Sequence, residues 1–356
     1  ELKPSAAILG AVAATGTTGL AEQYARLTEG CGLVDRSERG KLALTGGGAV
    51  EFLNGQVTNE LVGLKPGEGR YAAFLTHKGK MLGDLRILAV GEDPQGEPLE
   101  LLLDTERMAL QSLFDMIRRF KVGYEVELHK RTLESSLLSL IGPRADEVTA
   151  KAFGPLVTSL PEREGDHVLL ALRHTPVRLV RTDVGLDALF DSVAMEAVDS
   201  ALQAAGAEPA AEAAAEIVRV EHGRPRYGID LDESTIPQEA GLNERAVSFT
   251  KGCYVGQETV ARLHYKGKPN RHLRGLRLSE PVEPGTELRL DERSVGRVGS
   301  SVLSPALGPI GLALVRREAE PGTTVSVGES GASAVVSELP LGWASPGLAA
   351  PPGSSG

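Results

Sequence analysis

The chain has 356 residues, of which 41% are hydrophobic and 24% are charged, with a formal net charge of −10 and a pI near 5.4. This length predicts two or three domains, and the acidic balance argues against general binding to a nucleic-acid backbone. No apolar run approaches the roughly 18 residues that a membrane-crossing helix needs, and the Ala-rich N-terminal stretch, broken by Gly10, does not favour a signal peptide. With two cysteines there is no disulfide framework, so we expect a cytoplasmic protein.

The first part of the chain mixes helical and strand patterns. Hydrophobic spacing predicts helices over 18–30 and 105–121, and a short helix over 48–59 that breaks at Asn54–Gly55. Strands are expected at 41–46, 99–104 and 124–129. Two apolar runs within 69–90 flank the sequence HKGK, which predicts a β-hairpin with Gly79 in its turn.

The pattern partly recurs in the next hundred residues. We expect strands at 133–142, 167–172 and 176–182, and helices at 144–153, 185–207 and 209–223, the last with Pro209 in its first turn. Strands and helices do not alternate strictly. This favours an α+β fold with largely antiparallel sheets over a Rossmann fold.

The C-terminal part has a different character. Between 271 and 340, short strands are separated by Gly, Pro, Asp and Ser, and no long helix intervenes. This spacing is typical of a small β-barrel or sandwich. The Pro/Gly/Ser-rich segment 341–356 is expected to be a flexible tail.

Common phosphate and metal motifs are missing. TGGGAV at 45–50 has no following Gly-Lys-Ser/Thr and lacks the last Gly of GxGxxG, so it reads as a tight turn. The seven histidines have no HExxH or CxxC companions, so we expect no metal site.

One short stretch, KGCYVGQE at 251–258, carries unusual chemistry. A helix is expected to begin near Gly256, which would place Cys253 within about one turn of its positive N-terminal end. Lys251 adds a cation, and both features would favour the reactive thiolate. Glycines on either side would allow close backbone approach or a positive φ. The alternative is that Cys253 is a small buried apolar residue, which is how we interpret Cys31.

KGCYVGQE resembles the signature of the YgfZ-type folate-binding proteins, which are implicated in iron–sulfur cluster assembly and repair and are related to the glycine-cleavage aminomethyltransferase (T-protein). The segments 35–46, 71–87 and 218–242 resemble other parts of that family. The resemblance implies a core, 1–270, of two interleaved α+β subdomains around a central channel that holds tetrahydrofolate. A C-terminal β-barrel, 271–340, would close this channel.

The resemblance also implies functional residues. The cofactor would be held by Tyr71, Asp84, Arg219 and Glu221, while Cys253 and Lys251 would form the reactive group. The rest of the motif would support them through Gly252, Tyr254, Gly256, Gln257 and Glu258. Asp84 occupies the second of the transferase's paired Asp positions and Gly83 the first, and Leu186 stands where the transferase has a pterin-binding Glu.

Structural alternatives stay open for several of these residues. Asp84 could cap a backbone N–H group, and Lys251 could be a solvated cation. Arg219 could form an ion pair with Asp230 or Asp232, and Glu258 could pair with Arg262.

Three functions follow as hypotheses. The first is a tetrahydrofolate-binding protein that assists iron–sulfur client or assembly proteins through Cys253, without nucleic-acid or membrane partners. The second is a folate-dependent aminomethyl or one-carbon transferase, which the loss of a carboxylate at Gly83 would disfavour. The third is a binding module that docks a partner on the basic residues within 262–274.

Overall fold

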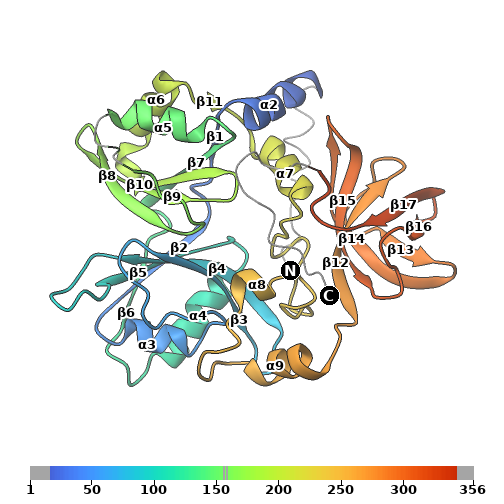
Figure 1. Cartoon of the computed structure of the whole chain (residues 1–356), viewed down its shortest axis with the longest axis horizontal. Coiled ribbons are helices and arrows are strands. Elements are labelled where there is room, and N and C mark those ends of the chain that lie inside the picture. Colours follow the sequence, from blue (N-terminus) through green and yellow to red (C-terminus); the bar gives the residue numbers. More distant parts are fainter. Residues whose placement is uncertain (1–16, 155–156, 158, 343–356) are drawn as a thin grey trace.

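The structure is a computed structural model that describes residues 17–154, 157 and 159–342. It contains two antiparallel-rich sheets and a closed barrel, arranged around the segment that runs from α7 (Glu212–Glu221) to α8 (Asn243–Ala246) (Figure 1). The predicted α+β class is therefore confirmed. Among the described residues, no helix has both the length and the apolar character needed to cross a membrane.

The first sheet has five strands in the order β3-β4-β5-β2-β6, and all neighbours are antiparallel. The predicted hairpin forms its edge, and Gly79 in the turn has φ of 75°. The helices α3 (Ala49–Asn54) and α4 (Leu110–Phe120) contact this sheet, and α4 is shorter than the expected 105–121. The strands span Gly40–Thr45 (β2), Gly69–Leu75 (β3), Met81–Val90 (β4), Glu100–Thr105 (β5) and Glu127–Lys130 (β6).

The second sheet has six strands in the order β11-β1-β7-β10-β9-β8, with α5 (Ala145–Phe153) and α6 (Met195–Ala205) packed on it. The strands span Gly32–Asp35 (β1), Ser135–Ile141 (β7), His167–Leu172 (β8), Thr175–Arg181 (β9), Gly185–Asp191 (β10) and Glu208–Pro209 (β11).

The prediction of one helix over 185–207 is wrong in its first third. Residues 185–191 form β10, which pairs with β7 on one side and β9 on the other. Leu186, Ala188 and Phe190 alternate along this strand with Asp187 and Asp191, and five of its seven residues are buried. The strand ends at Asp191, whose side chain accepts a hydrogen bond from the Val193 N–H and starts the helical turn that leads into α6.

Pro209 is a second correction, because it lies in β11 and not in the first turn of the helix. The register pairs Pro209 with Leu33 of β1, and α7 begins three residues later at Glu212. The helix α2 (Thr17–Glu29), predicted over 18–30, packs beside α7 through a small apolar cluster that includes Leu27 and Val218.

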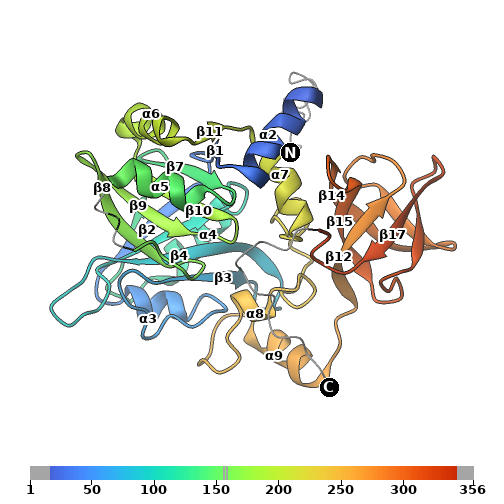
Figure 2. The same ribbon diagram turned by 45° about the horizontal axis from the view of Figure 1, so that its top comes forward.

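The C-terminal strands form a closed six-stranded barrel in the order β12-β15-β14-β13-β16-β17, which decides between the barrel and the sandwich (Figure 2). Its interior is lined mainly by valine, leucine and alanine. Leu341 still packs on the barrel and α7, while 343–356, most of the expected tail, lies outside the described residues. The strands span Arg271–Leu278 (β12), Glu287–Leu290 (β13), Arg293–Ser304 (β14), Gly308–Arg316 (β15), Thr324–Val327 (β16) and Ala332–Ser337 (β17).

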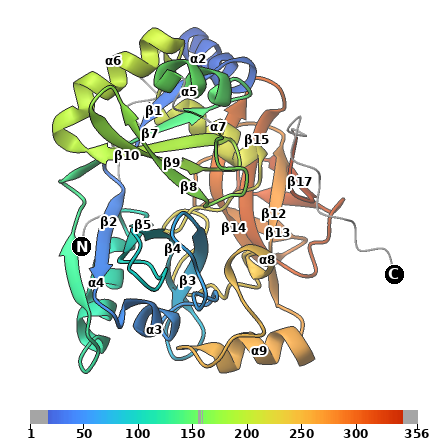
Figure 3. The ribbon, with the colours of Figure 1, turned by 60° about the vertical axis from the view of Figure 1, so that its left-hand side comes forward.

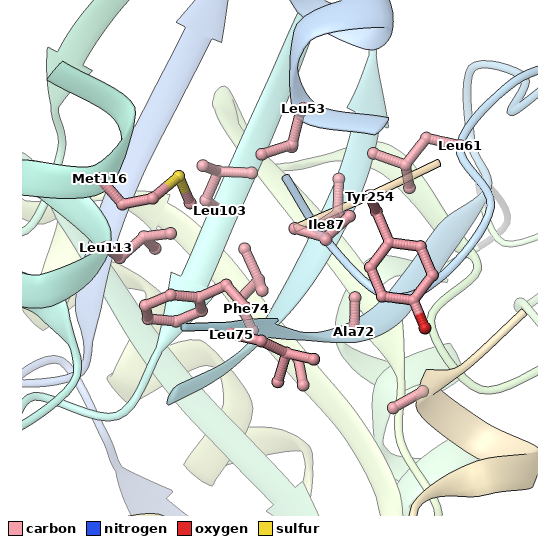
Figure 4. Close-up of a cluster of buried hydrophobic side chains, with 14 of the residues drawn as sticks. Leu53, Leu61, Ala72, Phe74, Leu75, Ile87, Leu103, Leu113, Met116 and Tyr254 are labelled. Carbon is pink, nitrogen blue, oxygen red and sulfur yellow. The ribbon is translucent and has the colours of Figure 1, made fainter. Parts of the chain in front are cut away.

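The largest apolar core lies under the five-stranded sheet, where Phe74, Leu103 and Leu113 pack together (Figure 4). Each such side chain, when fully buried, contributes about 1.5–3 kcal/mol to folding. Tyr254, from the KGCYVGQE stretch, is 7% exposed and belongs to this core. The stretch is thus part of the folding unit formed by the hairpin.

Charged side chains join the two sheets, which lie one above the other in Figure 3. Arg86 of β4 forms ion pairs with Asp104 of β5 and with Asp187 of β10, each at 2.5 Å. The Ser139 hydroxyl of β7 donates to the same Asp187 at 2.6 Å. Successive residues of a strand face opposite sides of the sheet. The face of β4 that carries Asp84 and Arg86 is therefore the one turned toward the six-stranded sheet.

Candidate functional site

Two of the predicted cofactor residues, Tyr71 and Asp84, lie together on the β3–β4 hairpin. The Tyr71 hydroxyl donates to Asp84 Oδ2 at 2.6 Å, and Ala73 stands directly opposite Asp84 in the register. Asp84 is only 6% exposed. Its carboxylate does not cap a backbone N–H in any hydrogen bond of the described residues, since it accepts from the phenol instead.

The surroundings of Asp84 change its protonation. Burial raises the pKa of Asp84 to about 6, and the nearby Glu106 carboxylate also raises it. The hydrogen bond from Tyr71 lowers this pKa but does not cancel the effect of burial. The cations Arg39 and Arg245 act in the opposite direction. Burial is the main cause that raises the pKa of Tyr71 well above its usual value, and the negative charge of Asp84 raises it further. A carboxyl group poised near neutral pH can give or take a proton under ordinary conditions.

A cluster of charged residues lies beside Tyr71, and none of its members was predicted from the sequence. The Arg245 guanidinium lies over the Tyr71 ring, 4.9 Å from its centroid, and forms an ion pair with Glu164. Glu164 also lies 3.7 Å from Arg224, which in turn pairs with Asp183 at 2.6 Å. These residues come from separate segments of the chain, so no local motif in the sequence could reveal the cluster.

Gly83 lies on the opposite face of β4 from Asp84. A Cβ atom added at Gly83 would come within 2.6 Å of the Ala109 Cβ and within 2.7 Å of the Phe74 ring. A carboxylate here would point into the apolar core below α4 and not toward Asp84. The missing first Asp of the transferase pair is therefore no argument against chemistry at Asp84.

Lys251, predicted to activate the thiol, is turned inward. It is 7% exposed, and its ammonium donates to the carbonyl oxygens of Asn54 at 2.7 Å, Val57 at 2.9 Å and Asn59 at 2.7 Å. Burial lowers its pKa to about 8. All three N–H bonds of the ammonium are used within the chain, so these contacts favour a structural role and not the solvated cation of the alternative.

Lys251 is connected to Tyr71 through hydrogen bonds of Asn59. The Asn59 side-chain amide donates to the carbonyl oxygens of Tyr71 at 2.9 Å and Arg245 at 3.2 Å. Because Lys251 donates to the Asn59 carbonyl, it helps to position the Asn59 side chain that bonds to the backbones of Tyr71 and Arg245.

Cys253 is an exposed free thiol, which excludes the buried alternative, whereas Cys31 is buried as expected. The helix α9 (Gln257–Lys266) begins four residues after Cys253, in agreement with the predicted start near Gly256. Gly256 has φ of 85°, and a Cβ there would lie 2.6 Å from the Thr76 carbonyl oxygen. The N-terminus of α9 thus sits against the turn of the β3–β4 hairpin.

The remaining motif residues have mixed roles. A Cβ atom added at Gly252 would meet no heavy atom within 4 Å, so neither close approach nor positive φ explains this glycine. The Gln257 amide donates to the Gly252 carbonyl at 3.4 Å. Burial raises the pKa of Tyr254 to about 12. Glu258 is exposed, and no ion pair among the described residues joins it to Arg262.

Arg219 is held in a buried network, as its structural alternative supposed. It forms ion pairs with Asp230 at 2.8 Å and with Glu216 at 2.5 Å, and it also donates to Ser300 and to the Arg224 carbonyl. Every N–H of the guanidinium has a partner. Its predicted role in holding the cofactor stays a prediction that these contacts do not favour.

Glu221 also has partners within the protein. Its carboxylate, 2% exposed, accepts from the Tyr24 hydroxyl at 3.0 Å and from the Ser304 hydroxyl at 2.5 Å. These contacts connect α2, α7 and the barrel. Its cofactor role likewise stays a prediction, and the structure brings it together with neither Tyr71 nor Asp84 in any hydrogen bond of the described residues.

The predicted basic stretch 262–274 is divided in two. Arg271 pairs with Glu239 at 2.9 Å, and Arg274 pairs with Glu338 at 2.9 Å. The cations that stay exposed without an ion pair among the described residues lie on or just after α9: Arg262, Lys266 and Lys268.

The residues around Asp84 suit a pterin in part. A buried carboxyl group beside a tyrosine can accept from the N–H edge of such a ring. Leu186, which the resemblance places at the transferase's pterin-binding Glu, is fully buried in β10. Within residues 17–154, 157 and 159–342, no group of three or more His, Cys, Asp or Glu side chains is placed to hold a metal ion.

Comparisons with known proteins agree on one family. Residues 14–251 match the GCVT N-terminal domain, and residues 271–341 match the glycine cleavage T-protein C-terminal barrel domain. A chloroplastic protein of Arabidopsis thaliana, provisionally named a transferase, is 30% identical over 86% of this chain and 70% of its own length. The aminomethyltransferase of Halothermothrix orenii is 27% identical over 87% of both chains.

The fold agrees as well. The glycine cleavage system aminomethyltransferase T from Bartonella henselae superposes with a TM-score of 0.80 and 24% identity, covering 91% of this chain and 90% of that one. The match to the N-terminal domain spans more than half of the sequence, and the barrel follows it in the same order. The chain therefore belongs to the family of the glycine-cleavage T-protein.

Proposed function

We propose that this protein binds a reduced folate beside Tyr71 and Asp84 and transfers a one-carbon unit, as the name of its aminomethyltransferase relatives describes. The observation that carries the proposal is the buried carboxyl group of Asp84, whose pKa burial raises to about 6. Such a group can exchange a proton with a bound amine near pH 7. The folate would supply the carbon carrier.

The residues of this chain have separate parts in the proposed site. Asp84 would hold or release a proton at the reacting nitrogen. The Tyr71 hydroxyl fixes Asp84 Oδ2 through its 2.6 Å hydrogen bond, and Arg245 stacks on the Tyr71 ring and holds its position. The Gly83 difference does not weaken the proposal, because that position faces the core.

Calorimetric titration with tetrahydrofolate tests the binding step. We expect saturable binding to the wild type and at least about tenfold weaker binding to Asp84→Ala, since a hydrogen bond to a charged group is worth about 1.5–3 kcal/mol. Asp115→Ala, which removes an exposed carboxylate on α4, is the matched control and should bind like the wild type. Equal affinities for all three proteins would contradict the proposed site.

One-carbon exchange tests the transfer step. The wild type should convert tetrahydrofolate in the presence of an aminomethyl donor, and Asp84→Asn should lose most of this activity while keeping its fold. A wild type that binds tetrahydrofolate but exchanges no carbon unit would leave folate binding in place and remove the transferase activity.

A second candidate function rests on the exposed Cys253. The YgfZ-type resemblance assigns such a thiol to iron–sulfur cluster assembly or repair in client proteins, and a single thiolate could ligate only one iron, so a partner would have to complete the site. A cytoplasmic location belongs to the same proposal. In cells lacking this protein, Cys253→Ser should fail to restore iron–sulfur enzyme activity. Full restoration by Cys253→Ser would remove the thiol from the function.

A further inference from the structure

A cavity lies between α4 and the outer strand β6, away from Asp84. It has a volume of about 370 Å³, within the range of small-molecule sites. Its apolar wall consists of Leu42, Leu110, Phe114 and Leu133. We call it the α4–β6 pocket.

The wall of the pocket is held in place by hydrogen bonds. The Thr132 hydroxyl donates to the Lys41 carbonyl at 3.1 Å and accepts from the Lys41 N–H at 2.9 Å. The Arg131 N–H donates to the same carbonyl at 3.0 Å. Leu133 lies in this fixed loop and is nevertheless 89% exposed. A large aliphatic side chain held outward at the rim of a cavity is available to contact a ligand with little loss of chain entropy.

The charge at the pocket is positive. Arg107 and Lys130 line it, both are exposed, and no carboxylate forms an ion pair with either of them within the part of the chain that the structure describes. Glu134, which also lines the pocket, is already paired with Arg131 at 2.7 Å. The Lys130 ammonium lies 4.8 Å from the centroid of the Phe114 ring, so a cation stands directly beside an aromatic wall.

This pocket is separate from the proposed folate site. Leu42 stands opposite Leu103 in the register, and Leu103 stands opposite Ile87, so these three side chains share one face of the sheet. Asp84 lies an odd number of residues from Ile87 on β4 and therefore faces the other side. A ligand in the α4–β6 pocket would be separated from Asp84 by the thickness of the sheet.

We propose that the α4–β6 pocket binds a small amphipathic anion, a compound with a flat apolar body and one carboxylate, sulfonate or phosphate group. The body would pack on Phe114, Leu110 and Leu133, and the anionic group would meet Lys130 and Arg107. The proposal is independent of the folate function, since it uses none of the residues around Asp84.

Fluorescence titration with two matched probes tests the proposal. The first probe is 1-anilinonaphthalene-8-sulfonate, and the second is N-phenyl-1-naphthylamine, which has the same rings without the charge. The full-length wild type should bind the sulfonate at one saturable site and the neutral probe more weakly. Lys130→Glu should weaken sulfonate binding at least about tenfold, as expected for loss of a charge-assisted contact, and leave the neutral probe unchanged.

Lys151→Glu, an equal charge change at an exposed site on α5, is the control and should bind the sulfonate like the wild type. Leu133→Asp is a second variant at an exposed position and should weaken both probes. Thermal melts monitor folding of each variant. Equal sulfonate affinity in Lys130→Glu and Lys151→Glu, or equal affinity of the wild type for both probes, would overturn the proposal.

Discussion

The Lys251 ammonium lies 2.7 Å from the carbonyl oxygen of Asn59, and the Asn59 side chain in turn holds the backbone of Tyr71. The first residue of the KGCYVGQE stretch therefore supports the proposed folate site from inside the protein. The side chains of the stretch lie in two different environments: its lysine and tyrosine are buried, while its cysteine is exposed.

Lys251→Met should destabilise the protein by about 2–5 kcal/mol, because three buried or partly buried carbonyl groups lose their donor together. Lys266→Met, which replaces an exposed lysine on α9, should change stability by less than about 0.5 kcal/mol. Urea denaturation measures both free energies of unfolding. If the two variants are equally stable, Lys251 does not have the structural role described above.

Asp84→Asn should have a pH-dependent effect on stability. The carboxyl group has a pKa near 6 when folded and 3.8 as a reference, so the folded state binds the proton more tightly. The stabilisation of the wild type by this proton is fully present below the reference pKa of 3.8 and is lost as the pH rises through the folded pKa of about 6. Asparagine does not ionise and still accepts from Tyr71, so its stability relative to the wild type should increase by about 2–3 kcal/mol from about pH 4 to about pH 7.

Urea denaturation of both proteins on either side of this range, at about pH 4 and about pH 7, measures the difference. Asp115→Asn is the control and should show little dependence on pH beyond that of the wild type. A constant difference between Asp84→Asn and the wild type at both pH values would mean that folding does not raise the pKa of Asp84.

Gly83→Ala should destabilise the protein by about 1–3 kcal/mol, because the added methyl group would overlap with Ala109 and Phe74. Gly252→Ala is a matched control, since nothing lies within 4 Å of its Cβ position. Gly83→Asp should be less stable still and should gain no transferase activity. Increased one-carbon exchange in a folded Gly83→Asp protein would show that this position faces the site after all.

Alkylation under native conditions should label Cys253 and spare Cys31. Cys253 is exposed, whereas Cys31 is 2% exposed and burial raises its pKa to about 12. Peptide mass spectrometry after brief treatment with iodoacetamide should find one labelled cysteine per chain. Labelling of both residues at the same rate would require the β1 region to open readily.

Comparison of the rate at Cys253 with that of a model peptide thiol separates two further possibilities. A faster rate would support activation by the N-terminus of α9, since the Lys251 ammonium is bound to carbonyl groups. A rate equal to that of the peptide would mean that the thiol is exposed but not activated.

Elements whose side chains follow a local pattern could be predicted before folding was considered. The β3–β4 hairpin, α2, α5 and the barrel strands are read from periodicity and from Gly and Pro in the turns, because backbone preferences act over a few residues. The helix start after Cys253 follows from the same local rules. The segment 185–191 was missed because it is only seven residues long and runs through the turn at Ser192–Ala194 into α6 with no Gly or Pro to mark the boundary.

The roles of the charged residues depended instead on contacts between distant segments. The sequence placed Lys251 beside Cys253, and the family resemblance predicted Arg219 to hold the cofactor. Folding turned the lysine toward Asn59 and placed the arginine in ion pairs with Asp230 and Glu216. It also brought Arg245 onto the Tyr71 ring from a remote part of the chain. A buried charge requires a partner, and that partner is supplied by whichever segment lies nearby in space, which the order of residues does not specify.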